Sequence, residues 1–178
     1  YGSGKSEVDE SAPAGDGYAS ELCRKWEETL KDLPESLPKA VMRFGVVLGN
    51  GGALKKLLPM FKCGVGGPIG DGQQGFSWVH IDDVVGAIMW LLESALSSEI
   101  HSEIYNVTSP NPVSQKEFAQ ALAKQLHRPS FMPTPAWVLR AVFGDMAQEL
   151  LIEGQFVKPT NLISEGFQFK YPDLESAL

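Results

Sequence analysis

The chain has 178 residues, of which 43% are hydrophobic, and its formal net charge is −7. This length and composition predict a globular domain with a sizeable core and argue against a disordered chain. Lysine and arginine form no basic stripe, and no apolar run approaches the roughly 20 residues that span a bilayer. We therefore expect neither a nucleic-acid-binding surface nor a transmembrane segment.

Cysteine and histidine are sparse. The two cysteines, Cys23 and Cys63, are too few for a disulfide framework, which favours a reducing intracellular compartment. The three histidines lie far apart in the sequence and lack metal-ligand spacing, so no metal site is expected.

The first 16 residues, YGSGKSEVDESAPAGD, predict a loop because they are rich in Gly, Ser, Asp and Pro. Gly4-Lys5-Ser6 has the form of the end of a P-loop, but the chain has no glycine at the required position before it. The acidic residues that follow would repel phosphate, so we interpret the stretch as a surface loop. A helix is expected from about Gly17, with Asp16 as its N-cap. An apolar residue at every fourth position would form a stripe along this helix, consisting of Tyr18, Leu22, Trp26 and Leu30.

The segment KAVMRFGVVLG predicts a strand buried on both faces, as in a parallel sheet, because it is nearly continuous in apolar residues. After the turn GNGG, the segment ALKKLLPMFKCG predicts an amphipathic helix that Pro59 kinks or ends. A Gly-rich loop, VGGPIGDGQQG, then leads into the short extended stretch FSWVHI.

Asp82 or Asp83 is expected to cap a helix over DVVGAIMWLLESAL, and EIYNVTS predicts another buried strand. Ser114 and Glu117 have the spacing of a capping box at the start of the next helix. The apolar stripe of that helix consists of Phe118, Leu122 and Leu126. Alternating strands and helices favour an α/β fold with a parallel sheet. After Pro129, prolines separate short helical segments, which predicts a separate C-terminal subdomain or cap.

Several stretches are distinctive together: RFGVVLG, GGPIGDGQQ, WVHIDDVV and LLIEGQFVKP…EGFQFKYPDLESAL. They resemble the atypical extended short-chain dehydrogenase/reductases of the NAD-dependent epimerase/dehydratase superfamily, and in particular its SulA-like branch. The resemblance covers essentially the whole chain. It implies that residues 1–128 form the C-terminal half of a Rossmann-like NAD(P)-binding domain and residues 129–178 a small, mainly helical C-terminal subdomain.

In this branch a central strand ends in a Tyr-Gly pair, which Tyr1-Gly2 would match. The resemblance therefore implies that the first Rossmann half, with its Gly-rich dinucleotide loop, precedes residue 1. The stretch LGNGGAL is the nearest to a Gly-x-Gly-x-x-Gly motif but lacks the third glycine, so we interpret it as a structural turn.

Typical members transfer hydride between a nicotinamide and a substrate carbon, and a Tyr-x-x-x-Lys pair on one helix handles the proton. In this chain the tyrosine position is Gly17 and the lysine position is Glu21. Tyr18 stands one residue later, with Leu22 four positions on. Two interpretations stay open: Tyr18 is a displaced catalytic acid, or it is the first member of the apolar stripe.

The resemblance implies that the strand end RFGVVLG backs a nicotinamide of NADP or NAD. Gly45, Val46 and Val47 are the cofactor-contact candidates, because glycine permits close approach of a ligand and valine gives an apolar wall. The alternative is an ordinary buried strand.

The Gly-rich loop lies where sugar-nucleotide enzymes bind the substrate. Phe76 occupies the position at which those enzymes usually have a diphosphate-binding arginine, which argues for a less charged ligand or none. His80 and Asp83 have the look of a catalytic pair, but in relatives the acid caps a helix and the histidine hydrogen-bonds the loop. The candidate substrate-pocket residues are Gly67, Pro68, Gln73, Gln74, Phe76, Trp78 and His80.

Two functions follow as hypotheses. The first is an NAD(P)-dependent oxidoreductase or epimerase with an unknown small-molecule substrate and a degenerate Tyr-Lys pair. The second is a catalytically inactive family member that serves as a regulatory or accessory subunit of a larger organellar assembly. By the resemblance, a plastid or mitochondrion is the expected compartment, with the cytoplasm as the alternative.

Overall fold

The computed structural model describes residues 1, 6–97, 101–130, 133–134 and 154–178. In the first half of the chain the elements are β1 (Glu7–Val8), α1 (Tyr18–Glu28), the 3-10 helix η1 (Thr29–Asp32), β2 (Val41–Phe44), β3 (Val46–Leu48), α2 (Gly52–Lys62), β4 (Gly75–Phe76) and β5 (Trp78–His80). The later elements are α3 (Ile81–Leu96), β6 (Ile104–Val107), β7 (Val113–Ser114), α4 (Gln115–Gln125), β8 (Phe156–Val157), α7 (Thr160–Ser164) and α8 (Leu174–Ala177).

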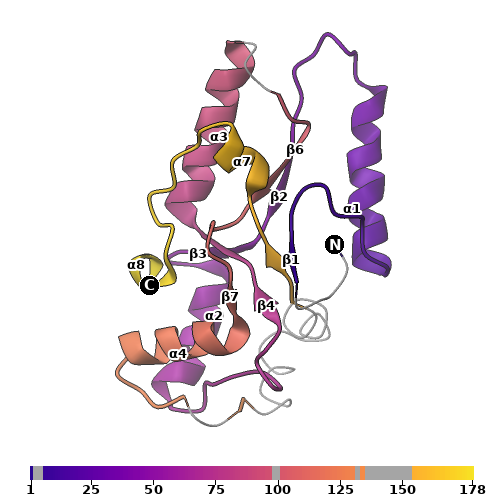
Figure 1. Ribbon diagram of the computed structural model, residues 1–178. Helices are drawn as coiled ribbons and strands as arrows, with labels where there is room; N and C mark the ends of the chain where they lie inside the picture. Colours follow the sequence, from indigo (N-terminus) through magenta and orange to yellow (C-terminus); the bar gives the residue numbers. More distant parts are fainter. Residues whose placement is uncertain (2–5, 98–100, 131–132, 135–153) are drawn as a thin grey trace.

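The strands β2 and β6 form a parallel pair in which Val41 lies opposite Ile104 and Phe44 opposite Val107. Figure 1 shows α1 and α3 on opposite sides of this pair. Helices on both faces of parallel strands are the layering of an α/β fold, as the alternating sequence pattern predicts. The fold class is therefore confirmed as the C-terminal part of a Rossmann-like fold.

A second unit lies beside this layer. The strand β3 pairs in parallel with β5, and β4 pairs antiparallel with β7. The helices α2 and α4 lie together with these short strands at the lower end of the molecule in Figure 1.

Each unit has its own apolar cluster. The pocket cluster consists of Leu48, Leu57, Met60, Phe61, Ile69, Phe76, Trp78, Phe118, Ala119, Leu122, Ala123 and Leu174. The sheet cluster consists of Val79, Val84, Ala87, Leu91, Tyr105, Val107, Leu162 and Phe167. Because α7 and α8 contribute to these clusters, the C-terminal segment is packed against both units.

Several sequence expectations hold. The structure has α3 and α4 where the sequence predicts them, and the Ser114–Glu117 capping box is present with both of its hydrogen bonds. The predicted strand 39–49 is present but divided at Gly45 into β2 and β3. No described helix is both long and apolar enough to cross a membrane. The predicted short helices that fall within 135–153, and the Gly4-Lys5 part of the P-loop resemblance, lie outside the described residues.

Other expectations are wrong. The N-cap of α1 is Gly17 rather than Asp16, and no side chain caps the N-terminus of this helix. Of the two alternatives for Pro59, the ending of the helix is wrong, because α2 continues through Pro59 to Lys62. The strand 39–49 is only partly buried, because Leu48 is its one buried residue and Phe44 is 50% exposed.

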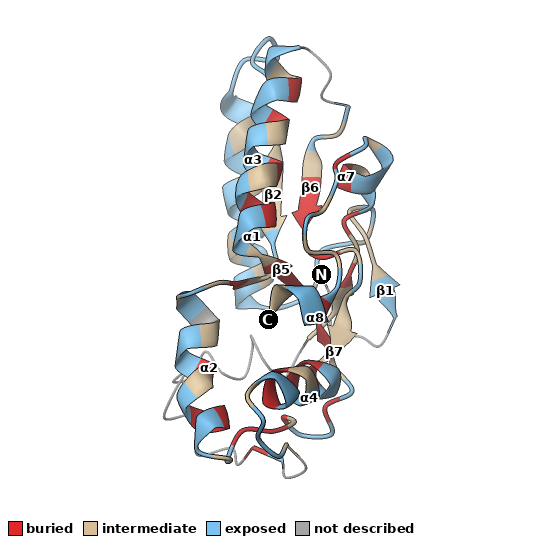
Figure 2. Ribbon diagram, turned by 90° about the vertical axis from the view of Figure 1, so that its left-hand side faces the viewer, coloured by how far each residue is buried: buried red, intermediate tan, exposed pale blue. Residues whose placement is uncertain are grey.

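The stripe on α1 is only partly covered, because Leu22 and Leu30 are half-buried while Tyr18 and Trp26 are exposed. Figure 2 shows α3 in front of α1; none of the residues of α1 is buried, and Tyr18 and Trp26 are 75% and 65% exposed. The period of four therefore predicts the helix correctly but not the burial of its apolar face.

Candidate functional site

The chain crosses from one unit to the other at Gly45. The Gly45 N–H donates to the carbonyl of Val107 in β6, whereas the Val46 N–H donates to the carbonyl of Ser77, beside β5. A Cβ atom at Gly45 would lie 2.6 Å from the Ser77 oxygen and 3.0 Å from the Thr108 Cγ2, so only glycine fits this crossing.

The other two cofactor-contact candidates follow this crossing directly. Val46 packs against the pocket cluster, and Val47 packs against the sheet cluster. Both are half-buried, and as consecutive residues of a strand they point to opposite faces, so each offers apolar surface to a different unit. The space beside Gly45 is filled by protein atoms, which gives the glycine a structural reason that the sequence alone does not reveal.

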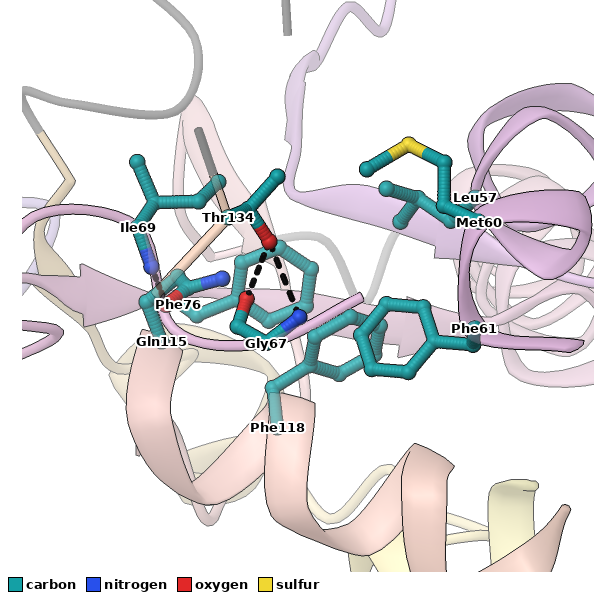
Figure 3. A pocket seen from close by; sticks show the side chains of 9 residues that line it. All are labelled: Leu57, Met60, Phe61, Gly67, Ile69, Phe76, Gln115, Phe118 and Thr134. Atoms are coloured by element: carbon teal, nitrogen blue, oxygen red, sulfur yellow. Dashed lines mark hydrogen bonds between the residues drawn. The ribbon is translucent and has the colours of Figure 1, made fainter. Parts of the chain in front are cut away.

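A pocket lies in the second unit, under the Gly-rich loop. Figure 3 shows the side chains around it, which come from α2, the loop, β4, α4 and the segment that holds Thr134. Its free volume is about 10 Å³, which is close to the least space that holds one water molecule. The lining residues are Leu57, Met60, Phe61, Gly67, Ile69, Phe76, Gln115, Phe118 and Thr134.

The pocket is mostly apolar and aromatic. The rings of Phe76 and Phe118 stack with their centroids 4.1 Å apart. The Thr134 hydroxyl donates to the Gly67 carbonyl at 2.9 Å and accepts from the Gly67 N–H at 2.8 Å. The Gln115 Oε1 accepts from the Ile69 N–H at 2.7 Å. None of the described residues that line the pocket is charged.

The structure brings part of the predicted pocket set together. Gly67 and Phe76 line the pocket, and the Pro68 carbonyl accepts a hydrogen bond from the Thr134 N–H. Trp78 is fully buried in the pocket cluster, and its indole Nε1 finds no hydrogen-bond partner in the described part of the chain.

The two glutamines of the set lie on the rim of the loop. Gln74 donates through Nε2 to the Ile69 carbonyl, so it helps to hold the loop in its bend. Gln73 is exposed, and its backbone N–H donates to the Asp71 carboxylate.

His80 lies apart from the pocket and caps α3. Its Nδ1 accepts from the Asp82 N–H at 3.1 Å, and its ring packs on Tyr171 at a centroid distance of 3.9 Å. The expectation that Asp82 or Asp83 caps this helix is therefore wrong, since the histidine side chain does so.

Asp83 is buried and anchors the C-terminal segment. Its two carboxylate oxygens accept from the backbone N–H groups of Lys170 and Tyr171, at 2.7 and 3.0 Å. The neighbouring Asp82 binds the Lys170 ammonium at 2.9 Å, and this hydrogen bond holds the pKa of the Asp82 carboxyl below its usual value. The two acids thus fasten this segment to the start of α3.

Tyr18 is the first residue of α1 and is 75% exposed. Four residues later stands Leu22, and the lysine of this helix, Lys25, pairs with Glu21 at 2.8 Å. The cation–π contacts among the described residues join Arg43 to Tyr1 and Lys170 to Tyr171, and neither involves Tyr18. A Tyr-Lys pair is thus absent from the described helix, as the spacing in the sequence predicts.

The sequence analysis misses one polar network, which joins β2 to α1. Arg43 forms a two-pronged ion pair with Glu27 of α1, both contacts at 2.7 Å, and donates to the Tyr1 hydroxyl at 2.8 Å. The Tyr1 hydroxyl in turn donates to the buried Asn106. The hydrogen bond with Glu27 raises the pKa of the Arg43 guanidinium above its ordinary value. An arginine inside an apolar strand is the one sequence signal that could have indicated this network.

A second network joins β6 to the C-terminal segment. Glu165 accepts hydrogen bonds from the hydroxyls of Tyr105 and Ser102, at 2.7 and 2.6 Å. Burial first, and then the hydrogen bond to Glu165, raise the pKa of Tyr105 to about 12. In the described part of the chain, no group of three His, Cys, Asp or Glu side chains is arranged to hold a metal ion.

The parallel β2–β6 layer, the crossing at Gly45 and the pocket unit together define the class. They are the C-terminal part of a Rossmann-type epimerase fold. The C-terminal residues 134–178 match the family model described as Domain of unknown function (DUF1731).

Comparison with similar proteins identifies a smaller group within this fold class. The human epimerase family protein SDR39U1 (isoform2), solved with NADPH, has a TM-score of 0.86 and 39% identity, covering 99% of this chain and 60% of the human one. The Arabidopsis thaliana protein named "Epimerase family protein SDR39U1 homolog, chloroplastic" is 42% identical, covering 100% of this chain and 50% of its own length. The Mus musculus SDR39U1 is 41% identical, covering 97% of this chain and 58% of its own length.

This chain is therefore a homologue of the epimerase family protein SDR39U1, with a DUF1731 segment at its C-terminal end. The chain spans about half to three-fifths of the length of these relatives.

Proposed function

We propose that this chain supplies the nicotinamide-facing wall and the substrate pocket of an NADP(H)- or NAD(H)-dependent oxidoreductase or epimerase. The observation that carries the proposal is the crossing at Gly45, where a single strand connects the parallel layer with the pocket unit. The NADPH in the human relative supports this choice of cofactor. In this proposal residues 1–128 belong to the dinucleotide-binding domain and residues 129–178 form the smaller subdomain.

The residues present fit one side of a nicotinamide ring. Val46 and Val47 are both half-buried and apolar, but they are consecutive in β3 and pack against different clusters, so one of the two would face the ring, while Gly45 acts by letting the strand cross close to Ser77. A bound nicotinamide would supply or accept a hydride. The part of these residues is to orient the ring and to exclude water from one of its faces.

Fluorescence titration with NADPH tests the proposal. We expect saturable binding, and Val46→Thr should weaken it several-fold because a hydroxyl replaces part of the apolar wall at almost constant shape. Val85→Thr is the matched control, since Val85 lies on α3 with 55% of its surface exposed. No change in NADPH fluorescence at millimolar cofactor would contradict the proposal.

A second candidate is a catalytically inactive member that acts as an accessory subunit among protein partners. Two observations favour this second candidate: Tyr18 is exposed, and the residue four positions after it is Leu22 instead of a lysine. NADPH binding without turnover of any carbonyl substrate in a broad panel would support this candidate. Turnover that is lost in Tyr18→Phe would instead make Tyr18 the displaced acid.

For the compartment, we propose an organelle, and the chloroplastic name of the Arabidopsis relative supports the plastid over the mitochondrion. Imaging of the complete protein with a fluorescent tag tests this, and a diffuse cytoplasmic signal would contradict it.

A further inference from the structure

The end of the chain, residues 165–178, spans the two units, and we call it the C-terminal strap. Near its start, Phe167 is buried in the sheet cluster. Near its end, Leu174 is buried in the pocket cluster, and Glu175 pairs with Lys124 of α4 at 2.9 Å. Figure 1 shows the strap in yellow, running from α7 beside β6 to α8 near the lower unit. Its two ends are therefore fixed in different apolar cores.

One buried carboxylate holds the middle of the strap. Between α7 and α8 the described chain forms no helix or strand, so its backbone groups need partners from elsewhere. Asp83, at the start of α3, is 2% exposed and accepts from the N–H groups of Lys170 and Tyr171 at 2.7 and 3.0 Å. Hydrogen bonds to a charged acceptor are stronger than neutral ones, and their loss would leave two donors without this partner.

Two neighbouring polar contacts of the strap are weaker. The Lys170 ammonium pairs with Asp82, but the Asp82 side chain is 48% exposed, and exposed ion pairs contribute little. The Ser109 hydroxyl donates one neutral hydrogen bond to the Pro172 carbonyl at 2.7 Å. Asp83 is therefore the strongest polar anchor in the middle of the strap.

We propose that the C-terminal strap holds the pocket unit against the parallel layer, and that Asp83 is the positioning residue that fastens it. A segment tied to both cores limits how far they can separate, and this limit depends on the anchor between its ends. The crossing at Gly45 lies between the same two units. The strap would thus also set the geometry of the nicotinamide wall, a consequence that rests on the function proposed above.

The native cysteines allow a direct test. Cys23 lies in α1 and Cys63 directly follows α2, and both are free and exposed. Spin labels on these two residues report the distance between the units by double electron–electron resonance. We expect one narrow distance distribution for the unchanged protein. Asp83→Asn replaces one acceptor oxygen with a donor, so the distribution should become wider and its mean longer.

The adjacent acid provides the matched control. Asp82→Asn makes the same chemical change at the exposed ion pair and should leave the distance distribution as it is in the unchanged protein. Motion of α1 by itself would affect all three labelled proteins equally. Equal distributions for Asp83→Asn and the unchanged protein, or equal widening in both variants, would overturn the role of Asp83.

Hydrogen exchange in the unchanged protein tests the anchor without a substitution. The amides of Lys170 and Tyr171 should exchange much more slowly than that of the exposed Gln168 in the same strap. Equally fast exchange at all three would show that the strap is not fastened and would overturn the proposal even if Asp83→Asn did not fold.

NADPH fluorescence separates the strap from the proposed function. Asp83→Asn should weaken NADPH binding several-fold, and Asp82→Asn should not. A changed distance with unchanged NADPH affinity would overturn the link between the strap and the nicotinamide wall. Failure of the unchanged protein to bind NADPH would overturn the proposed function, while the distance and exchange measurements would still decide the role of the strap.

Discussion

The helices α1 and α4 have the same length of 11 residues and the same apolar period, yet they end up in opposite surroundings. In α4 the stripe residues Phe118 and Leu122 are each 2% exposed, while in α1 Tyr18 and Trp26 are 75% and 65% exposed. The period fixes which side chains share a face. Whether that face is covered depends on which other segments fold against it.

The two helices are also held by different forces. The helix α4 packs into the pocket cluster, and its N-terminus is closed by the Ser114–Glu117 capping box. The helix α1 has no buried residue and no side-chain N-cap, and its recorded link to the sheet is the ion pair between Glu27 and Arg43. One helix is held by apolar burial, and the other by a polar tether.

The largest expected effect on the free energy of unfolding comes from comparing the apolar stripe of α4 with that of α1. Phe118→Ala should lower the free energy of unfolding by about 3 to 5 kcal/mol, since it removes a buried ring that stacks on Phe76. Trp26→Ala should change it by less than about 0.5 kcal/mol because the indole is exposed. Urea unfolding measures both, and similar losses in the two variants would show that the α1 stripe is covered in solution.

The tether of α1 should be the next most sensitive point. Glu27→Gln removes a charge-assisted, two-pronged contact to a partly buried Arg43, so we expect a loss of about 2 kcal/mol. The exposed pair of Lys25 with Glu21 is the control, and Glu21→Gln should cost less than about 0.5 kcal/mol. If the two variants were equally stable, the polar tether would not hold α1.

The helix N-termini give a smaller contrast. Ser114→Ala removes the side-chain acceptor of the Glu117 N–H and should cost about 1 kcal/mol. Asp16→Ala should be close to neutral, because Gly17 is the N-cap of α1 and no side-chain cap is formed. Thermal unfolding of both variants checks this, and a destabilised Asp16→Ala protein would restore Asp16 as the cap.

The smallest effect is in the pH dependence of the α4 cap. Hydrogen bonds from the Ser114 backbone N–H and then its hydroxyl lower the pKa of Glu117 below its ordinary value of 4.5. The carboxylate therefore stabilises the folded state above about pH 4.5, and this contribution is lost as the pH falls through the lowered pKa. Glu117→Gln should flatten the acid side of the stability profile slightly, measured by urea unfolding between pH 3 and 6. An unchanged profile would contradict the assignment.

The resemblance and the periodicity together predict much of the fold. The C-terminal end of α3, the start of α4 with its capping box, and the strand β6 follow from local sequence, since caps and turns act between residues close in the chain. The same local reasoning misplaces two caps. The helix begins at Ile81, so the His80 side chain takes the place expected for an acid, and Asp83 instead accepts from the backbone N–H groups of Lys170 and Tyr171.

The residues of the candidate site also fall into those that the sequence predicts and those that it does not. Gly67 and Phe76 are predicted from the loop and do line the pocket. Gln115 and Thr134 are not predicted, because they come from later segments and meet the loop only after folding. A long-range hydrogen bond leaves no periodic trace in the sequence.

The sequence by itself determines which residues are helical or extended, and which of their side chains share a face. Only the tertiary structure decides that Gly45 is needed to let a strand pass Ser77, that Gln115 holds the Gly-rich loop at Ile69, and that Tyr18 and Trp26 of the α1 stripe are exposed. The physical reason is the range of the forces: helix and strand periods arise from neighbouring residues, whereas burial and steric fit depend on segments that are distant in the chain.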